Sequence, residues 1–159
     1  MAIKEQLKSI LQFYQGSVKK QLDDLSEEES LKKLFDLVNH VRWITGHIAY
    51  YANDINRLVG GESDFPDDWL HFRGGEPLKE DAWYPPFKDI RAKLYSLYDS
   101  INANIDNLTD DDLNQVFELY DQWKPTRFDG IIYLLTHETY HSGQITIIRK
   151  AIGKPALEG

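Results

Sequence analysis

Apolar residues recur at steps of three and four along four separate stretches of this chain, and such spacing is typical of helices. The first stretch places one apolar stripe on residues 3–22, formed by Ile3, Leu7, Ile10, Leu11, Tyr14, Val18 and Leu22. No stretch shows the sustained alternation of apolar and polar residues that a half-buried strand would need. Long amphipathic helices bury their apolar faces against one another, so the sequence predicts an all-α four-helix bundle.

The predicted helices span residues 3–22, 27–58, 87–107 and 127–152, with a short helical segment from about 109 to 120. Ser26 and Glu29 have the spacing of a capping box, which places the start of the second helix near Glu27. Gly60 and Gly61 end that helix, because glycine readily turns the backbone left-handed. A chain of 159 residues is most simply one domain, covering residues 1–159.

The connection between the second and third helices, residues 61–86, is predicted to be long and irregular. It contains Pro66, Pro77, Pro85 and Pro86 and the pair Gly74–Gly75, which exclude a long helix. A loop of this length in a compact domain is usually functional or mobile. Its aromatic residues indicate that it packs onto the domain: Trp69, Phe72, Trp83 and Tyr84. His71 in this loop is expected to be exposed.

Two histidines of the last predicted helix, His137 and His141, are four residues apart and therefore lie on one helical face. This spacing allows two imidazoles to share one metal ion. His47 lies in the middle of the second predicted helix, on its apolar stripe. If these two helices are neighbours, the imidazoles of all three histidines meet at mid-depth of the bundle, a common place for metal sites.

Three histidine ligands would leave coordination positions open, which is typical of catalytic rather than structural sites. The chain has no cysteine, so any metal must be held by His, Asp or Glu, and disulfides are excluded. Gly46 and Gly143 flank the proposed ligands, and we interpret them as room for close helix approach or for a ligand.

Six further residues are candidates for supporting the ligands or lining a pocket: His40, Trp43, Tyr51, Tyr133, Glu138 and Gln144. Gln144 could orient a ligand imidazole or contact substrate, or it could make a helix–helix hydrogen bond. The three aromatic residues flank the site and would by default belong to the core. His40 could equally be a core or boundary histidine, and Glu138 could support a ligand, form a salt bridge or face solvent.

The segment HETYH at 137–141 also matches the H-E-x-x-H signature of zinc peptidases, with Glu138 as general base. A peptidase of that class needs a third ligand downstream, and no histidine follows His141. Gln144 stands where the longer metzincin signature has glycine, and no strand is predicted beside the helix. These differences disfavour a peptidase.

Net charge and hydropathy narrow the range of partners. The formal charge is −8 and the pI is about 5.0, which disfavours nucleic-acid binding because phosphates require a positive face. No apolar run is long enough to cross a bilayer, so no membrane partner is predicted. The first residues are typical of an amphipathic helix rather than a signal peptide, and a cytoplasmic location is the expectation.

Two segments resemble the DinB/YfiT-like superfamily of metal-dependent enzymes: GHIAY at 46–50 and HETYHSGQ at 137–144. The resemblance covers essentially the whole chain in helix order and length. It implies a four-helix bundle with a three-histidine site for nickel or zinc, in which His47, His137 and His141 match the family's ligands. It also implies a homodimer. Characterised relatives include S-transferases that use bacillithiol or mycothiol and a thiol-dependent maleylpyruvate isomerase.

The resulting hypothesis is a metal-dependent S-transferase that acts on small electrophiles. Because the chain has no cysteine, the thiol would be a low-molecular-weight cofactor. The first alternative is a metal-dependent hydrolase with the same ligands. The second is a metal-binding, stress-associated protein without enzymatic activity.

Overall fold

The computed structural model of the chain describes residues 2–34, 38–74, 78–80, 83–120 and 122–155. Its long helices are α1 (Ile3–Asp23), α2 (Val41–Leu58), α3 (Phe87–Ile105) and α5 (Arg127–Ala151). Shorter elements are the 3-10 helices η1 (Glu29–Leu31) and η2 (Asp67–Arg73) and the helix α4 (Asp110–Leu113). The described residues contain two isolated β-bridges and no strand.

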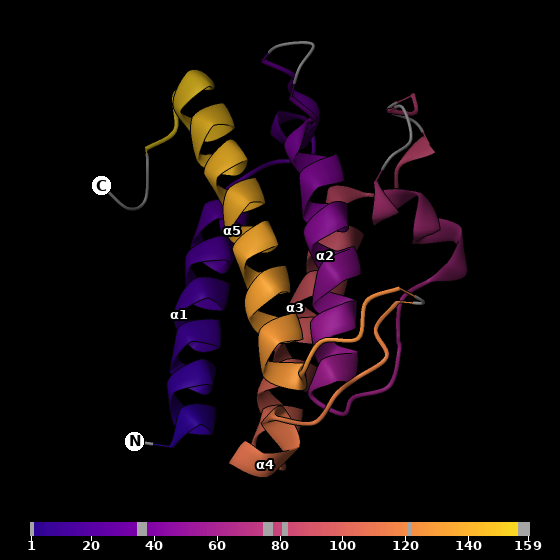
Figure 1. Cartoon of the computed structure of the whole chain (residues 1–159). Helices are drawn as coiled ribbons and strands as arrows, with labels where there is room; N and C mark the ends of the chain where they lie inside the picture. The colour runs from indigo at the N-terminus through magenta and orange to yellow at the C-terminus, as the bar shows by residue number, and fades with distance from the viewer. Residues whose placement is uncertain (1, 35–37, 75–77, 81–82, 121, 156–159) are drawn as a thin grey trace.

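The four long helices form the predicted bundle (Figure 1). α1 packs against α3 and α5, and α2 packs against the same two helices from the other side. The buried apolar side chains of all four helices form one core, including Leu11, Ile48, Leu94 and Ile131. α2 and α5 are therefore neighbours, which is the arrangement that three converging histidines require.

The predicted start of the second helix near Glu27 is wrong. The predicted capping box does form, because Glu29 N donates to Ser26 Oγ (3.1 Å) and Ser26 N donates to Glu29 Oε2 (2.9 Å). It opens only one 3-10 turn, however, and α2 begins at Val41. His40 supplies the cap of α2, since its Nδ1 accepts a hydrogen bond of 3.0 Å from Trp43 N. Residues 35–37 lie outside the described part of the chain.

The connection between α2 and α3 packs onto the bundle, as its aromatic residues indicated. Gly60 ends α2 with a φ of +92°. η2 then runs along α2 and buries Phe72 completely. The ring of Phe72 occupies the space beside Gly46, where a Cβ would lie 2.3 Å from its Cε1 atom. Gly46 therefore makes room for this loop residue, rather than for a neighbouring helix.

The short helical segment predicted up to about Tyr120 is also shorter than expected. α4 keeps the predicted capping box of Thr109 and Asp112 but ends at Leu113. The chain then folds back on itself before α5, with Phe117 N donating to Pro125 O (2.8 Å) and Arg127 N donating to Gln115 O (2.9 Å). These tertiary bonds override the local helical tendency.

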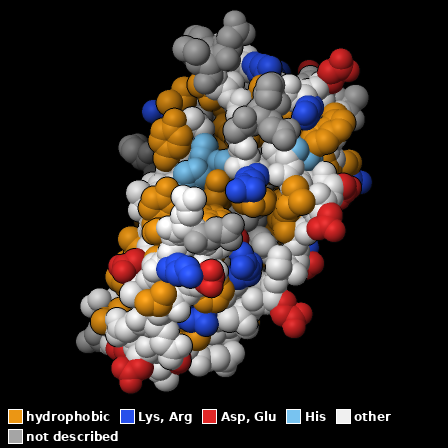
Figure 2. All heavy atoms as spheres, turned by 45° about the vertical axis from the view of Figure 1, so that its right-hand side comes forward, with side chains coloured by type: hydrophobic (Ala, Val, Ile, Leu, Met, Phe, Trp, Pro, Cys, Tyr) orange, Lys and Arg blue, Asp and Glu red, His pale blue; other side chains and the backbone are white. Residues whose placement is uncertain are grey.

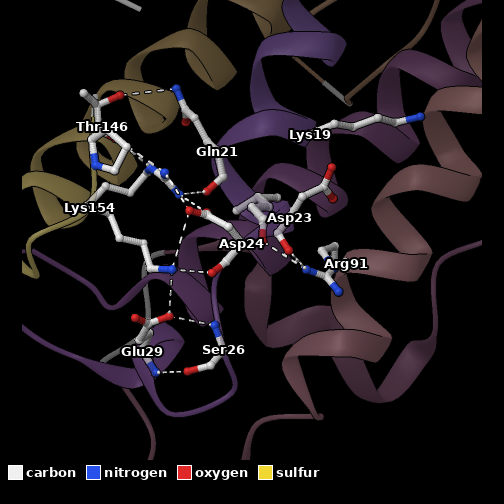
Figure 3. A network of polar contacts seen from close by, with 12 residues as sticks. Lys19, Gln21, Asp23, Asp24, Ser26, Glu29, Arg91, Thr146 and Lys154 are labelled. Atoms are coloured by element: carbon white, nitrogen blue, oxygen red, sulfur yellow. Dashed lines mark hydrogen bonds and ion pairs between the residues drawn. The ribbon is translucent and has the colours of Figure 1, made fainter. Parts of the chain in front are cut away.

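A buried polar network joins the C-terminal ends of α1 and α5 (Figure 3). The side chain of Arg149 is fully buried and its Nη1 donates to Gln21 O (2.7 Å). Arg149 also pairs with Asp24, which in turn accepts from Lys154. The Gln21 side chain donates to Thr146 Oγ1 (3.2 Å) and so ties the two helices a second time.

None of the helices in the described ranges combines the length and the apolarity that a membrane crossing would need.

Candidate metal centre

His47 from α2 and His137 and His141 from α5 converge beside the η2 connection. One ring nitrogen of each lies within 4.8 Å of the other two. His137 Nε2 and His141 Nε2 are 3.2 Å apart. Two histidine nitrogens bound to one tetrahedral zinc at 2.0–2.1 Å would be about 3.4 Å apart, so this separation fits shared coordination. Figure 2 shows histidine side chains (pale blue) at the surface, next to hydrophobic (orange) and basic (blue) ones.

Two of the three imidazoles are held by an oxygen at Nδ1. His47 Nδ1 donates to the backbone carbonyl of Phe72 (2.6 Å), and His141 Nδ1 donates to Gln144 Oε1 (2.8 Å). A carbonyl oxygen can only accept, so each bond places the proton on Nδ1 and leaves the Nε2 lone pair free. In metal-bound histidines, a hydrogen bond from the ring nitrogen that does not bind the metal fixes the tautomer and the orientation of the ring. Gln144 therefore lies where it can orient a ligand.

Burial keeps all three imidazoles in the neutral form that a metal requires. Desolvation lowers the pKa of His47 to about 4, with a further contribution from its histidine neighbours. Desolvation and the proximity of His141 lower the pKa of His137 to about 4. The pKa of His141 is lowered as well, again mainly by burial. At neutral pH the cluster presents lone pairs rather than protons to a cation.

Aromatic rings hold the His47 imidazole from both sides along α2. Trp43, one turn earlier, stacks on it at a centroid distance of 4.6 Å and an interplanar angle of 19°. Tyr51, one turn later, meets it edge-on at 4.9 Å and also contacts the His137 ring at 4.5 Å. Gly74 closes the remaining side, because a Cβ there would lie 3.1 Å from His47 Cε1. Its φ of +94° also favours glycine.

The residues present fit a divalent metal ion. The three imidazoles are neutral, one nitrogen of each lies within 4.8 Å of the other two, and imidazole suits zinc, nickel, copper and iron. His137 Nδ1 has no hydrogen-bond partner among the described residues. No hydrogen bond at this nitrogen therefore competes with metal binding. No described carboxylate joins the three histidines in this cluster.

Glu138 does not reach this cluster. Its side chain is 1% exposed and its carboxyl lies near the phenols of Tyr14 on α1 and Tyr98 on α3. Burial raises the pKa of this carboxyl well above its usual range, which favours its protonated form. Of the three roles considered from the sequence, neither a salt bridge nor solvent exposure fits this position. A general base on the metal, as the H-E-x-x-H signature requires, does not fit either.

The other residues that the sequence singled out lie at different distances from the three histidines. His40 is buried at the start of α2 and packs edge-on against Tyr84 at 5.0 Å, so it caps the helix and does not line the centre. Trp43 and Tyr51 contact the histidine rings. Tyr133, expected by default in the core, is 59% exposed.

A Cβ added at Gly143 would have no described atom within 4 Å, so close packing does not account for this glycine. His71, expected to be exposed, is half-buried against Trp83.

A pocket opens beside His137, and part of its lining was not predicted from the sequence. A cavity of about 190 Å³ is lined by Tyr51, Arg73, Tyr120, Tyr133 and His137. A second cavity of about 310 Å³ shares Tyr120 and Tyr133 with it and adds Trp123. Arg73, Tyr120 and Trp123 come from irregular segments, whose positions no periodicity predicts. The aromatic content of these segments was the available signal.

Comparison with known proteins places this arrangement in a family. The family model of the DinB superfamily matches residues 14–145. A DinB-like protein from Bacillus cereus ATCC 10987 superposes with a TM-score of 0.75 at 18% identity, covering 99% of this chain and 97% of that one. A conserved protein from Enterococcus faecalis gives 0.70 at 18% identity, with coverages of 97% and 99%.

YfiT from Bacillus subtilis also superposes with a TM-score of 0.70 at 18% identity, covering 96% of this chain and 89% of that one. It is described as a probable metal-dependent hydrolase with an unusual four-helix bundle topology. These likenesses show the fold. No curated protein matches the chain.

Proposed function

The chain belongs to the DinB superfamily, and we propose that it is a metal-dependent enzyme that transfers a low-molecular-weight thiol to a small electrophile. The observation that carries this proposal is the cluster of His47, His137 and His141, whose ligand nitrogens lie within 4.8 Å of one another and whose member His137 lines a pocket. Three protein ligands leave positions for a nucleophile, and the adjoining cavity has room for its target.

A divalent ion at this centre would lower the pKa of a bound thiol or water and so supply a nucleophile near neutral pH. The chain's own contribution is to orient the ligands through Phe72 O and Gln144 Oε1 and to hold the electrophile beside His137. In the transfer the thiolate sulfur forms a bond to carbon, the halide or other leaving group departs with its electron pair, and the thiol proton goes to solvent. The thiol comes from solution, because the chain has no cysteine.

The test uses protein purified without a histidine tag and loaded separately with zinc or nickel. Each form is incubated with bacillithiol or mycothiol and a chlorodinitrobenzene, and conjugate formation is followed. We expect conjugation that depends on the metal and is lost in His137→Ala and His141→Ala. Conjugation at the uncatalysed rate with every thiol and metal would contradict the proposal.

Hydrolysis is the second candidate, and the likeness to YfiT favours it. The same ligands would serve, with water in place of the thiol. A panel of esters, amides and phosphoesters without any thiol separates the two reactions. If the metal raises the melting temperature but neither assay shows turnover, the site is structural and the protein is a non-enzymatic metal binder.

We also propose that the protein is a homodimer that pairs through the outer surfaces of α1 and α5. Both helices carry exposed large apolar side chains: Ile3, Ile10, Phe13, Tyr140 and Ile147. Phe13, at 74% exposed, borders a groove that continues to Gly143 on α5. A second copy covering this surface would remove these groups from water.

A further inference from the structure

The inner cavity, beside His137, and the outer cavity next to it differ in character, although they share Tyr120 and Tyr133. The inner one contains His137 and, among the described residues of its lining, one cationic side chain, Arg73. The described residues that line the outer one are all aromatic. Their volumes are about 190 and 310 Å³. Since an apolar cavity of about 150 Å³ can hold benzene, either could take a six-membered ring.

Arg73 has a guanidinium that is available to a ligand. It makes no ion pair with any described residue, while its backbone carbonyl accepts a hydrogen bond of 3.2 Å from the Tyr51 hydroxyl. That bond anchors the end of η2 to α2, so the residue is held at the pocket wall. A guanidinium prefers carboxylate or phosphate oxygens, which it binds through two parallel hydrogen bonds.

The acidic group that shares these surroundings is Asp54, and it is already engaged. Its carboxylate accepts from the Tyr120 hydroxyl (2.6 Å) and pairs with Arg57 (3.1 Å). Arg73 acts on it only through its charge, without a direct contact. The whole chain is acidic, with a net charge of −8. A cationic side chain beside a pocket therefore attracts an anion to this place in particular.

The outer cavity offers flat apolar surfaces. Trp123 meets the Tyr133 ring at 4.8 Å and lies nearly parallel to Tyr120 at 6.1 Å. Reciprocal backbone hydrogen bonds between Tyr120 and Trp123 hold both rings in place. Aromatic faces of this kind bind planar groups by offset or edge-to-face stacking.

We propose that the substrate of this centre is a small molecule with an acidic group and a planar apolar body, held with the acidic group on Arg73 and the planar body against Tyr120, Trp123 and Tyr133. The proposal rests on the proposed function, because it places this molecule beside His137. It assigns Arg73 and Trp123 to substrate selection.

The test compares phenylacetate with its neutral analogue phenylacetamide, using calorimetry on the zinc-loaded and the metal-free protein. We expect phenylacetate to bind at least tenfold more tightly in both forms. Arg73→Gln should remove this preference, and Arg73→Lys should keep part of it. Trp123→Leu should weaken both ligands by a similar factor. Lys20→Gln removes one positive charge from an exposed position on α1 and should change neither affinity.

Equal affinities for the two ligands, or a preference that survives Arg73→Gln, would overturn this inference. Survival in Arg73→Gln together with loss in the metal-free protein would assign the acidic group to the metal instead. A zinc titration of Arg73→Gln separates substrate selection by Arg73 from the proposed metal-dependent function. We expect this variant to bind zinc with unchanged affinity. A protein that binds no zinc but still selects phenylacetate through Arg73 would contradict the metal-dependent function alone.

Discussion

At the scale of single residues, the centre depends on imidazoles that stay neutral because they are buried. His47 and His137 have a pKa of about 4, against an ordinary value of 6.5. A lowered histidine pKa means that the metal does not have to displace protons until the pH falls well below 6. The centre should therefore remain competent under mildly acidic conditions.

This predicts the proton balance of metal binding. Three ordinary histidines would release about two protons when zinc binds at pH 6, whereas these should release fewer than about one. Calorimetry in buffers of different ionisation enthalpy measures the number directly. Release of two or more protons would mean that the imidazoles are solvated and not buried as described.

The hydrogen bond from His141 Nδ1 to Gln144 Oε1 predicts an effect on affinity. Gln144→Leu should weaken zinc binding about 10- to 100-fold, the usual effect of removing a group that orients a metal ligand. Glu138→Gln is the matched comparison, because Glu138 is buried one residue from His137 yet faces Tyr14 and Tyr98. Its zinc affinity should match the wild type. Equal losses in the two variants would show that Glu138 supports the metal after all.

The positions of His47, His137, His141 and Gln144 could be predicted because helical geometry is regular. Residues four apart on α5 must share a face, and a mid-helix histidine on α2 faces the same core. Phe72, whose carbonyl holds His47, could not be predicted in the same way. A backbone atom in an irregular connection leaves no periodic signal.

At the scale of elements, the centre is built where η2 packs on α2. The packing is close, with Phe72 against Gly46 and Gly74 against His47. The sequence indicated that this connection packs onto the domain but not where, since its contacts are tertiary. The same limit explains the wrong start of the second helix. His40 caps α2 and packs against Tyr84, which lies far along the chain, so the local sequence does not reveal this start.

Gly46→Ala tests the contact between these two elements. A Cβ 2.3 Å from Phe72 Cε1 must displace the ring, and overpacking of this kind costs about 1–3 kcal/mol. The variant should therefore lose stability and, because Phe72 O moves away from His47, bind zinc more weakly. Urea unfolding and a zinc titration measure the two effects.

Gly16→Ala on α1 is the control, because outside the local helix backbone no described atom lies within 4 Å of the added Cβ. It should be stabilised by up to about 1 kcal/mol through helix propensity, with unchanged zinc affinity. A Gly46→Ala variant that behaves like Gly16→Ala would contradict the described packing of η2.

At the scale of the whole molecule, the all-α bundle was predictable from apolar periodicity alone, because four amphipathic helices have few ways to bury their stripes. The neighbouring placement of α2 and α5 agrees with the convergence assumed from the sequence. The pocket was not predictable, since Arg73 and Trp123 meet there only after two irregular segments have folded onto the bundle. Nor does periodicity identify the surface that a second copy would cover.

The proposed dimer predicts a mass in solution of twice the chain's 18.5 kDa. Phe13→Glu places a charge in the centre of the α1 and α5 surface and should yield the monomer. Val116→Glu, at a position 68% exposed on the segment before α5, should leave the mass unchanged. Light scattering after gel filtration measures both. A wild-type monomer, or a dimer that survives Phe13→Glu, would exclude this interface.

The claim on which everything else depends is that imidazoles from α2 and α5 bind one cation. An anomalous difference map from a crystal soaked in zinc tests it most directly. We predict a single strong peak about 2.0–2.1 Å from one nitrogen each of His47, His137 and His141. A map without a peak between these rings, or with the rings turned away from one another, would contradict the account.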